Sequence, residues 1–180
     1  MSEAELISGC KEGNRKVQKA LYDKYAGTMY AICLRYCHDR DNALDVLQDG
    51  FIKVFSRIGT FQGIGSFEGW MKKIFIHSAI NHYHKVRHLS ELIIQQEEIH
   101  DTGSDQTDII SKMSEREILK LISTLPDGYR MVFNLYVIEG YDHEEIAVML
   151  GITAGTSRSQ LVKARKTLQK KIKELKIIAA

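Results

Sequence analysis

Proline is nearly absent from this chain, which contains Pro126 alone in 180 residues. Proline disrupts helices because it lacks a backbone N–H and because its ring clashes with the preceding turn. No apolar run approaches the roughly 20 residues that a membrane-spanning helix needs. The acidic, polar start of the chain, residues 1–9, does not resemble a signal peptide. We therefore expect an all-α protein that is located in the cytoplasm.

Cysteine is also scarce, and the three that occur are Cys10, Cys33 and Cys37. An odd number of cysteines without a secretion signal favours free thiols in a reducing compartment. The spacing of Cys33, Cys37 and His38 matches no common zinc pattern. Buried thiols are therefore the first interpretation, and a metal-binding or redox-sensing role is the alternative.

Features of an enzyme are missing as well. Gly63-x-Gly65 alone is too weak a motif to indicate a phosphate-binding loop. Four histidines between residues 77 and 88 lie around different faces of one predicted helix, so their spacing does not indicate a metal site. We therefore expect no catalytic residues, no metal, no cofactor and no small-molecule substrate.

The net charge of +2 conceals three segments of alternating sign. Residues 70–87 carry a net charge of +4, residues 88–115 carry −6, and residues 142–180 carry +4. Two basic segments separated by an acidic one are typical of two surfaces that face anions such as nucleic acid. Ordinary solvated helix faces are the alternative for either basic segment taken alone.

Apolar residues at three- and four-residue steps predict three helices in the first half of the chain. The N-caps of these helices are expected at Asn14, Asp41 and Ser66, and a glycine-rich loop, residues 59–65, precedes the last one. These helices suffice for a small bundle, which defines a first domain at residues 1–88. Between residues 89 and 112 the apolar period degrades and acidic residues dominate, which indicates a flexible acidic linker.

Residues 113–180 form the second predicted domain. Asp142 and Glu145 have the spacing of a capping box, and Gly151 has the position of a helix C-terminus. A small residue in mid-helix, Ala147, followed by a glycine turn and a basic helix, is typical of a helix-turn-helix. A plain helical hairpin is the alternative.

The second helix of such a motif enters the major groove of DNA. Its exposed face is predicted to carry Arg158, Ser159, Gln160, Val162, Lys163 and Lys166. Arginine and lysine donate to guanine O6 and N7, and the later lysines suit phosphate. A net charge of +4 is weak for DNA binding by this domain alone, because such binding is lost quickly as salt rises. The sequence therefore predicts help from a larger partner.

The first domain carries aromatic residues among basic ones. The rings between residues 60 and 85 are Phe61, Phe67, Trp70, Phe75 and Tyr83. Aromatic rings beside cations suit single-stranded nucleic acid, because stacking stabilises each base by roughly 1–3 kcal/mol. A core position is the alternative for any single ring. With the polar loop at residues 63–66, the pattern predicts a pocket for a flipped base.

Three groups of motifs recur in a fixed order. Residues 45–51 read DVLQDGF, and residues 60–74 contain TF and SFEGW. The third group, in the second domain, is LP at 125–126, EGY at 139–141, EIA at 145–147, LG at 150–151 and GT at 155–156. Together they resemble the polymerase-docking, promoter-melting and promoter-binding segments of the extracytoplasmic-function (ECF) class of bacterial RNA polymerase sigma factors.

The resemblance implies a transcription initiation factor with three binding surfaces. The implied polymerase-binding residues are Asp45, Gln48, Asp49 and Ile52. Those that capture the unpaired strand of the minus-ten element are Phe61, Ser66, Phe67, Lys73, His77 and Asn81. Those that read the minus-thirty-five element are Thr156, Arg158, Ser159, Lys163 and Lys166. The implied partners are core RNA polymerase and promoter DNA, and relatives also have an anti-sigma factor, about which the sequence itself says nothing.

Five residues depart from the family's pattern. His77 stands where asparagine is frequent, Gln160 and Lys163 stand where arginine is frequent, and Ser157 replaces a usual apolar residue. Gly50 is unusual inside a docking helix, where glycine costs about 1 kcal/mol relative to alanine.

The alternative function is a stand-alone helix-turn-helix regulator whose N-terminal bundle senses a ligand or dimerises. Substitution of Gln48 distinguishes the two functions, because it should abolish polymerase binding in a sigma factor and change nothing in the regulator.

Overall fold

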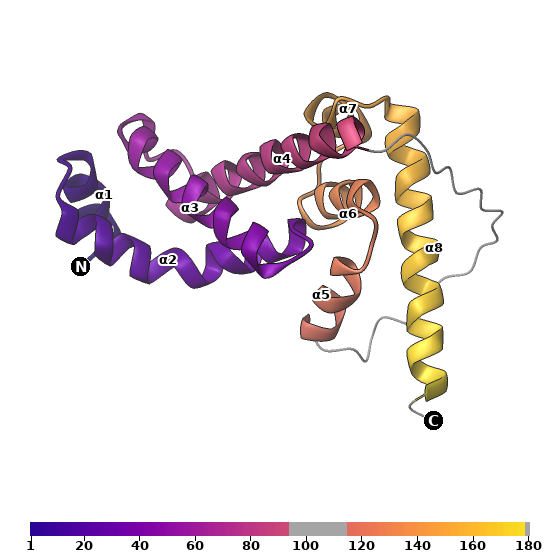
Figure 1. Ribbon diagram of the computed structural model, residues 1–180. Coiled ribbons are helices and arrows are strands. Elements are labelled where there is room, and N and C mark those ends of the chain that lie inside the picture. Colours follow the sequence, from indigo (N-terminus) through magenta and orange to yellow (C-terminus); the bar gives the residue numbers. More distant parts are fainter. Residues whose placement is uncertain (94–114, 179–180) are drawn as a thin grey trace. The chain divides into compact units, whose positions relative to one another are not determined.

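The computed structural model describes residues 1–93 and 115–178. Within these residues the regular structure is helical and no strand occurs, so the predicted all-α class is confirmed. The chain divides into two compact units, Met1–His82 and Tyr83–Ala180, whose helices are drawn in Figure 1. None of the described helices combines the length and the hydropathy that crossing a membrane requires.

The first unit is a helical bundle. Its helices are α1 (Glu3–Lys11), α2 (Arg15–Tyr36), α3 (Arg40–Arg57) and the part of α4 (Phe67–Ile93) up to His82, and a short 3-10 turn, η1 (Ile58–Thr60), follows α3. α2 packs against both α1 and α3. α4 continues to Ile93 instead of ending near residue 88, and the rest of the predicted linker, residues 94–112, lies outside the described residues.

Two predicted caps begin helices in this unit. Asn14 Oδ1 accepts a hydrogen bond from the backbone N–H of Lys16 at 3.0 Å, and α2 begins at the next residue, Arg15. Ser66 Oγ accepts from the backbone N–H of Gly69 at 3.0 Å, directly before α4. Both side chains satisfy N–H groups that the first helical turn leaves without an internal partner.

The predicted cap at Asp41 is wrong, because Asp39 caps α3 instead. Asp39 has the extended backbone of a capping residue, with φ −133° and ψ 174°, and its Oδ1 accepts from the N–H of Asn42 at 2.8 Å. Asp41 lies in the first turn of α3, where a carboxylate is favourable beside the positive end of the helix dipole.

The core of the first unit contains apolar side chains from all four helices. The largest fully buried ones include Leu6, Leu21, Met29, Phe67, Met71 and Phe75. The three cysteines are buried free thiols, which agrees with their first interpretation. Burial, together with the neighbouring Cys37, raises the pKa of Cys33 to about 12. Within the described part of the chain, no group of three potential ligands is arranged to hold a metal ion.

The second unit is built around one long helix. Its elements are α5 (Glu115–Ser123), α6 (Asp127–Phe133), a π turn η2 (Asn134–Ile138), α7 (His143–Leu150) and α8 (Ala154–Ile178). α8 packs against α5, α6 and α7 and is the long yellow helix of Figure 1. The buried side chains include Leu135, Ile146, Leu150, Leu161 and Ala164. The helix-turn-helix predicted for this part of the chain corresponds to α7 and α8.

Candidate nucleic-acid interface

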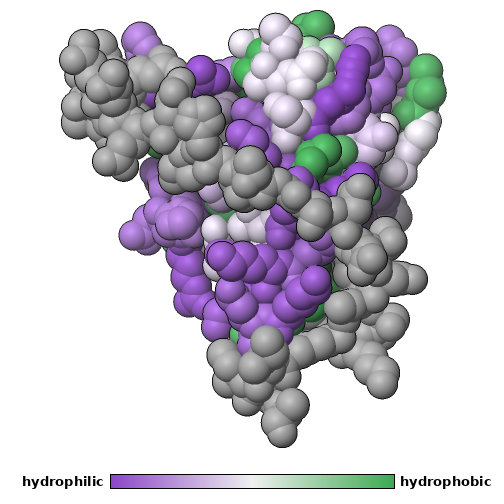
Figure 2. All heavy atoms as spheres, turned by 90° about the vertical axis from the view of Figure 1, so that its right-hand side faces the viewer, coloured by the Kyte–Doolittle hydropathy of each residue, from purple (hydrophilic) through white to green (hydrophobic). Residues whose placement is uncertain are grey.

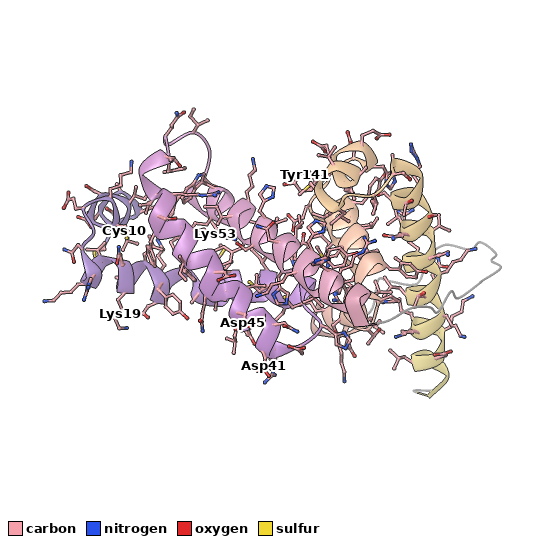
Figure 3. All side chains as sticks on the ribbon, turned by 45° about the horizontal axis from the view of Figure 1, so that its top comes forward. Cys10, Lys19, Asp41, Asp45, Lys53 and Tyr141 are labelled. Atoms are coloured by element: carbon pink, nitrogen blue, oxygen red, sulfur yellow. The ribbon has the colours of Figure 1, made fainter. Side chains whose placement is uncertain are left out.

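α3 has a buried face and an exposed face. Val46, Leu47, Phe51 and Val54 are buried in the bundle. The exposed face carries all four predicted polymerase-binding residues, Asp45, Gln48, Asp49 and Ile52. Their spacing of three and four residues places them on one stripe of the helix. Asp45, the first of the four, is labelled in Figure 3. The apolar side chain of Ile52 is 65% exposed, which suits a surface that meets another protein.

Three aromatic rings form a cluster where the glycine-rich loop meets α4. Phe67 stacks on Trp70, with ring centroids 5.5 Å apart and planes at 18°, and Phe61 contacts both rings. Phe67 is fully buried, with 0% of its surface exposed, so it supports the cluster from within the core. Phe61 and Trp70 are half-buried and keep part of their rings accessible. Lys11 Nζ donates to the Phe61 carbonyl at 3.3 Å, which ties this loop to α1.

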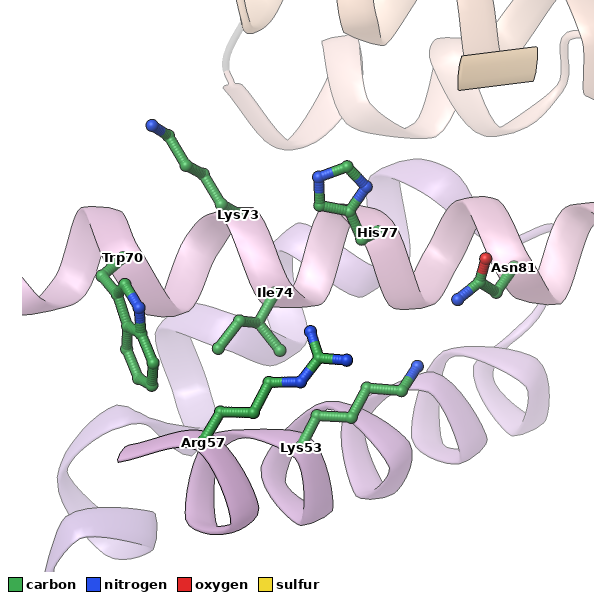
Figure 4. Close-up of a pocket in the computed structure, with 7 residues that line it drawn as sticks. All are labelled: Lys53, Arg57, Trp70, Lys73, Ile74, His77 and Asn81. Atoms are coloured by element: carbon green, nitrogen blue, oxygen red, sulfur yellow. The ribbon is translucent and has the colours of Figure 1, made fainter. Parts of the chain in front are cut away.

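A pocket of about 250 Å³ opens between α3 and α4. Its lining residues are Lys53 and Arg57 of α3 and Trp70, Lys73, Ile74, His77 and Asn81 of α4. Figure 4 shows Arg57 extending from α3 towards α4, with the Trp70 ring along the same gap. Two lysines, one arginine and an indole line this pocket together with one histidine, and no carboxylate does. Its chemistry therefore suits an anion that also carries a flat ring, such as a nucleotide.

The structure brings half of the predicted minus-ten residues together in this pocket. Lys73, His77 and Asn81 recur every four residues, so they lie along one face of α4, and all three are exposed. Ser66 is exposed at the start of α4, where it caps the helix. Phe61 lies in the aromatic cluster beside Trp70, and Phe67 faces the core instead of the pocket.

Sequence reasoning did not identify Lys53, Arg57 and Trp70 as site residues. Lys53 and Arg57 are one turn apart on α3 and so share a face, and Lys53 Nζ donates to the Ser78 hydroxyl of α4 at 3.0 Å. The sequence signal for these two residues is a basic pair at four-residue spacing, directly before the aromatic loop. The pair lies on a different face of α3 from the acidic stripe.

α7 and α8 have the local geometry of a helix-turn-helix. The predicted capping box is present, because Asp142 Oδ1 accepts from the Glu145 N–H at 2.7 Å and Glu145 Oε2 accepts from the Asp142 N–H at 2.9 Å. Gly151 ends α7 with φ +63°, a left-handed conformation that glycine adopts without strain. Thr153 Oγ1 then accepts from the Thr156 N–H at 3.0 Å and begins α8.

The first turns of α8 present a hydrophilic outer face. Arg158, Ser159 and Lys163 are exposed there, and Thr156 and Lys166 are half-buried. The Ser159 hydroxyl donates to the Thr156 carbonyl at 2.9 Å, so its oxygen remains available as an acceptor. Figure 2 views the molecule from the side on which α8 lies in Figure 1, and most of the described surface there is hydrophilic.

Two polar links between α7 and α8 were not foreseen from the sequence. His143 Nδ1 and Ser157 Oγ share a hydrogen bond of 2.9 Å, and the Tyr136 ring stacks on the imidazole at 4.4 Å. Arg158 Nη2 donates to Glu144 Oε1 at 3.1 Å. The available signal was Ser157, a polar residue at a position that is usually apolar. Arg158, which the sequence predicts to contact DNA, is therefore held by the preceding helix.

Comparison with protein families matches each unit to a different region of one family. Residues 21–88 match the model described as Sigma-70 region 2, and residues 115–168 match Sigma-70, region 4. Together the two matches cover about two thirds of the chain. The first match contains α3 and the pocket, and the second contains α7 and the first part of α8, to residue 168.

Curated relatives align with nearly the full length of the chain. The RNA polymerase sigma-H factor of Pseudomonas aeruginosa is 26% identical, with 96% of this chain and 95% of the relative covered. The ECF RNA polymerase sigma-E factor of Haemophilus influenzae is 25% identical, with 97% of each covered. The sigma-E factor of Escherichia coli is 24% identical, with 97% and 96% covered.

A solved structure has the same fold. It is the sigma factor RpoE of Bartonella quintana, crystallised with the anti-sigma factor NepR. It is 19% identical in sequence with a TM-score of 0.50, and the alignment covers 86% of this chain and 96% of that one. At this level of identity the similarity describes the fold.

Proposed function

The chain belongs to the ECF class of the sigma-70 family of RNA polymerase sigma factors, and on that premise we propose which surfaces carry each part of promoter recognition. The single observation that carries the proposal is the cationic pocket beside the aromatic cluster. A bare DNA-binding regulator has no need of a site for an unpaired base, whereas a factor that opens promoters does.

The exposed stripe of α3 binds core RNA polymerase in this proposal. Asp45 and Asp49 supply negative charge, Gln48 supplies an amide that both donates and accepts, and Ile52 supplies exposed apolar surface. A stripe of this kind is complementary to a basic helical surface with an apolar groove. Because Lys53 and Arg57 line the pocket from outside this stripe, docking and DNA capture use two different faces of α3.

The pocket between α3 and α4 takes the unpaired non-template strand of the minus-ten element. Phe61 and Trp70 provide ring surface on which a base stacks, and His77, Asn81 and Ser66 provide hydrogen-bonding groups. Lys53, Arg57 and Lys73 neutralise the phosphates of the same strand. A base that leaves the duplex loses stacking of a few kcal/mol, and such a pocket offsets that loss.

α8 reads the duplex of the minus-thirty-five element from the major groove. Arg158 and Lys163 donate to guanine O6 and N7 in this arrangement, Ser159 and Thr156 contact base edges or phosphate, and Lys166 contacts the backbone. The N-terminal turns of the recognition helix carry these residues, as the geometry of the motif requires.

The proposed division of labour follows the predicted domains, residues 1–88 and 113–180, with residues 89–112 as an acidic linker. Because α4 continues to Ile93, only the 19 residues 94–112 of this linker could extend, and they could span roughly 65 Å at about 3.3–3.6 Å each. A relaxed coil of this length averages only about 22–26 Å. The two promoter elements are separated by about two turns of DNA, each about 34–36 Å, so polymerase must hold the linker extended.

Further properties follow from the same premise. The chain has no catalytic activity of its own in this proposal, and it acts in the cytoplasm on core polymerase and promoter DNA. The Bartonella quintana relative was solved with an anti-sigma factor, and this supports an anti-sigma partner for the present chain as well. A partner of that kind would compete with polymerase for the exposed stripe of α3.

Run-off transcription tests the proposed function. Core polymerase is mixed with a pool of random promoter sequences, with and without the full chain, and the transcripts are sequenced. We expect start sites that appear only when the chain is present and that share two sequence elements about two helical turns apart. Tight binding of promoter duplex by the isolated chain at physiological salt, with no effect on polymerase, would favour the stand-alone regulator.

A further inference from the structure

We propose that Glu144 is a positioning residue that aims Arg158 at its base, and that the hydrogen bond between His143 and Ser157 holds the helix turn from which Arg158 extends. The inference rests on the proposed reading of the minus-thirty-five element by α8. It adds to that reading a residue outside the recognition helix that sets specificity.

The two links join the first turn of α7 to the first turns of α8. His143 pairs with Ser157, and the next residue of α7, Glu144, pairs with the next residue of α8, Arg158. A single hydrogen bond between two packed helices fixes the distance between its own two groups only. Two adjacent bonds define a direction, and the second of them ends on the guanidinium that contacts DNA.

The inner link is buried and braced. Ser157 has 0% of its surface exposed, and His143 Nδ1 lies 2.9 Å from its hydroxyl oxygen. The Tyr136 ring lies nearly parallel to the imidazole, at 18° and 4.4 Å between centroids. The imidazole is therefore held between η2 and α8. Because a buried polar group that loses its partner is unfavourable, this link resists sliding of α8 along α7.

The outer link is exposed and therefore contributes little to stability. The Arg158 and Glu144 side chains are 52% and 68% exposed, and ion pairs this exposed stabilise proteins only weakly. Its effect is on the direction of the arginine. Arginine has five N–H donors in a planar fork, and Glu144 engages one nitrogen, Nη2, which leaves donors for the two acceptors of a guanine.

Glu144 also opposes the wrong contacts of Arg158. A guanidinium without a partner binds any nearby phosphate, which carries no sequence information. The Glu144 carboxylate beside Arg158 repels phosphate and competes with it for the same donors. Contact with DNA weakens the ion pair between Arg158 and Glu144, and only a base that accepts two hydrogen bonds compensates for that loss. Glu144 should therefore lower non-specific affinity and raise discrimination at the one base pair that Arg158 reads.

The experiment uses holoenzyme reconstituted from core polymerase and the full chain. Binding is measured to the promoter found by run-off transcription and to fragments in which each minus-thirty-five base pair is changed singly. The chains compared are wild type, Glu144→Gln, Arg158→Ala and the double variant. Glu174→Gln is the matched control, because it removes the same charge from an exposed carboxylate that lies far from Arg158 in sequence, near the end of α8.

We expect Glu144→Gln to reduce discrimination at one base pair by about three- to tenfold, the range of an ordinary net hydrogen bond, and to raise affinity for non-promoter DNA. The double variant should match Arg158→Ala at that base pair, because Glu144 acts through Arg158. Glu174→Gln should leave the discrimination ratio unchanged. Equal losses at every base pair, or an effect of Glu144→Gln that persists without Arg158, would overturn the proposal.

A second variant tests the inner link. Ser157→Ala should weaken discrimination at every base pair that α8 reads, because the whole first turn shifts, while polymerase binding stays at the wild-type level. Unchanged discrimination in Ser157→Ala would remove the inner link from the proposal. If wild-type holoenzyme recognises no promoter, the proposed function fails. If it recognises one and Glu144→Gln behaves as Glu174→Gln does, only this inference fails.

Discussion

The ring of Phe75 in α4 lies against the backbone of Gly50 in α3, in the space that any side chain at position 50 would occupy. The same ring meets Phe51 edge-on at 5.2 Å. Glycine lowers the stability of a helix by about 1 kcal/mol relative to alanine, which is why Gly50 is unexpected inside α3. The close approach of α4 explains it, because a β-carbon would push α3 and α4 apart.

Gly50→Ala should therefore destabilise the first unit. The gain in helix propensity is about 1 kcal/mol, and overpacking a filled core costs typically about 1–3 kcal/mol, so we expect a net loss of up to about 2 kcal/mol. Urea unfolding followed by circular dichroism measures the change. Gly27→Ala is the matched control, because Gly27 lies inside α2 with no atom near its missing side chain. That control should stabilise the protein, and a stabilising Gly50→Ala would contradict the packing argument.

Ile52→Asp should abolish or strongly weaken binding to core polymerase without unfolding the chain. The residue is exposed, so its replacement should change the free energy of unfolding by no more than about 0.5 kcal/mol. Co-purification with core polymerase and a binding titration measure the first effect, and urea unfolding measures the second. Val148→Asp is the control, because it makes the same kind of change at an exposed position of α7. Equal polymerase binding by both variants would exclude the stripe of α3 as the docking surface.

Arg57→Ala should weaken capture of the unpaired minus-ten strand and reduce its salt dependence. Each phosphate contact on single-stranded DNA contributes about 0.7 to the slope of log affinity against log salt, so loss of one contact should lower the slope by about that amount. Holoenzyme binding to a fork-junction fragment at several salt concentrations measures it. Lys19→Ala removes an equal charge from an exposed ion pair on α2. The same slope in both variants would place the strand outside the pocket.

Stability should fall at alkaline pH because of Cys33. Its folded-state pKa of about 12 lies above its ordinary value of 9.0, so the unfolded thiol loses its proton first as pH rises. The contribution is complete below pH 9 and is lost by about 1.4 kcal/mol per pH unit between 9 and about 12. Unfolding curves of wild type and Cys33→Ala, measured at each pH, isolate this effect from other groups. Parallel pH profiles for the two chains would show that Cys33 does not titrate in this way.

Local signals in the sequence predicted the helices that have a clear apolar stripe. α2, with its cap at Asn14, and α7, with its capping box and Gly151, follow the prediction closely. The apolar pattern did not predict α1 because this helix is short, although Ser2 and Glu5 form a capping box at its start. Asp39 was missed as the cap of α3 because Asp41 is an equally good capping residue by type. Only the backbone angles distinguish them.

The sequence predicts some features of the candidate site and leaves others to the fold. Periodicity alone puts Asp45, Gln48 and Ile52 on one stripe, because a helix repeats every 3.6 residues. It does not decide that Phe67 is buried while Phe61 and Trp70 keep exposed edges, since all three are similar rings close together in the chain. That outcome depends on where α2 and α3 lie.

The residues alone predict a helical, proline-poor protein with an exposed acidic stripe on one helix and a basic helix near its C-terminus, because helical faces and turn residues are local properties. Tertiary packing decided the rest. Lys53 and Arg57 lie beside α4 and line a cationic pocket with it. Phe75 occupies the space beside Gly50, and His143 and Glu144 form hydrogen bonds to α8. These contacts join residues that are 14 or more positions apart in sequence, and only the folded arrangement of helices brings such residues within bonding distance.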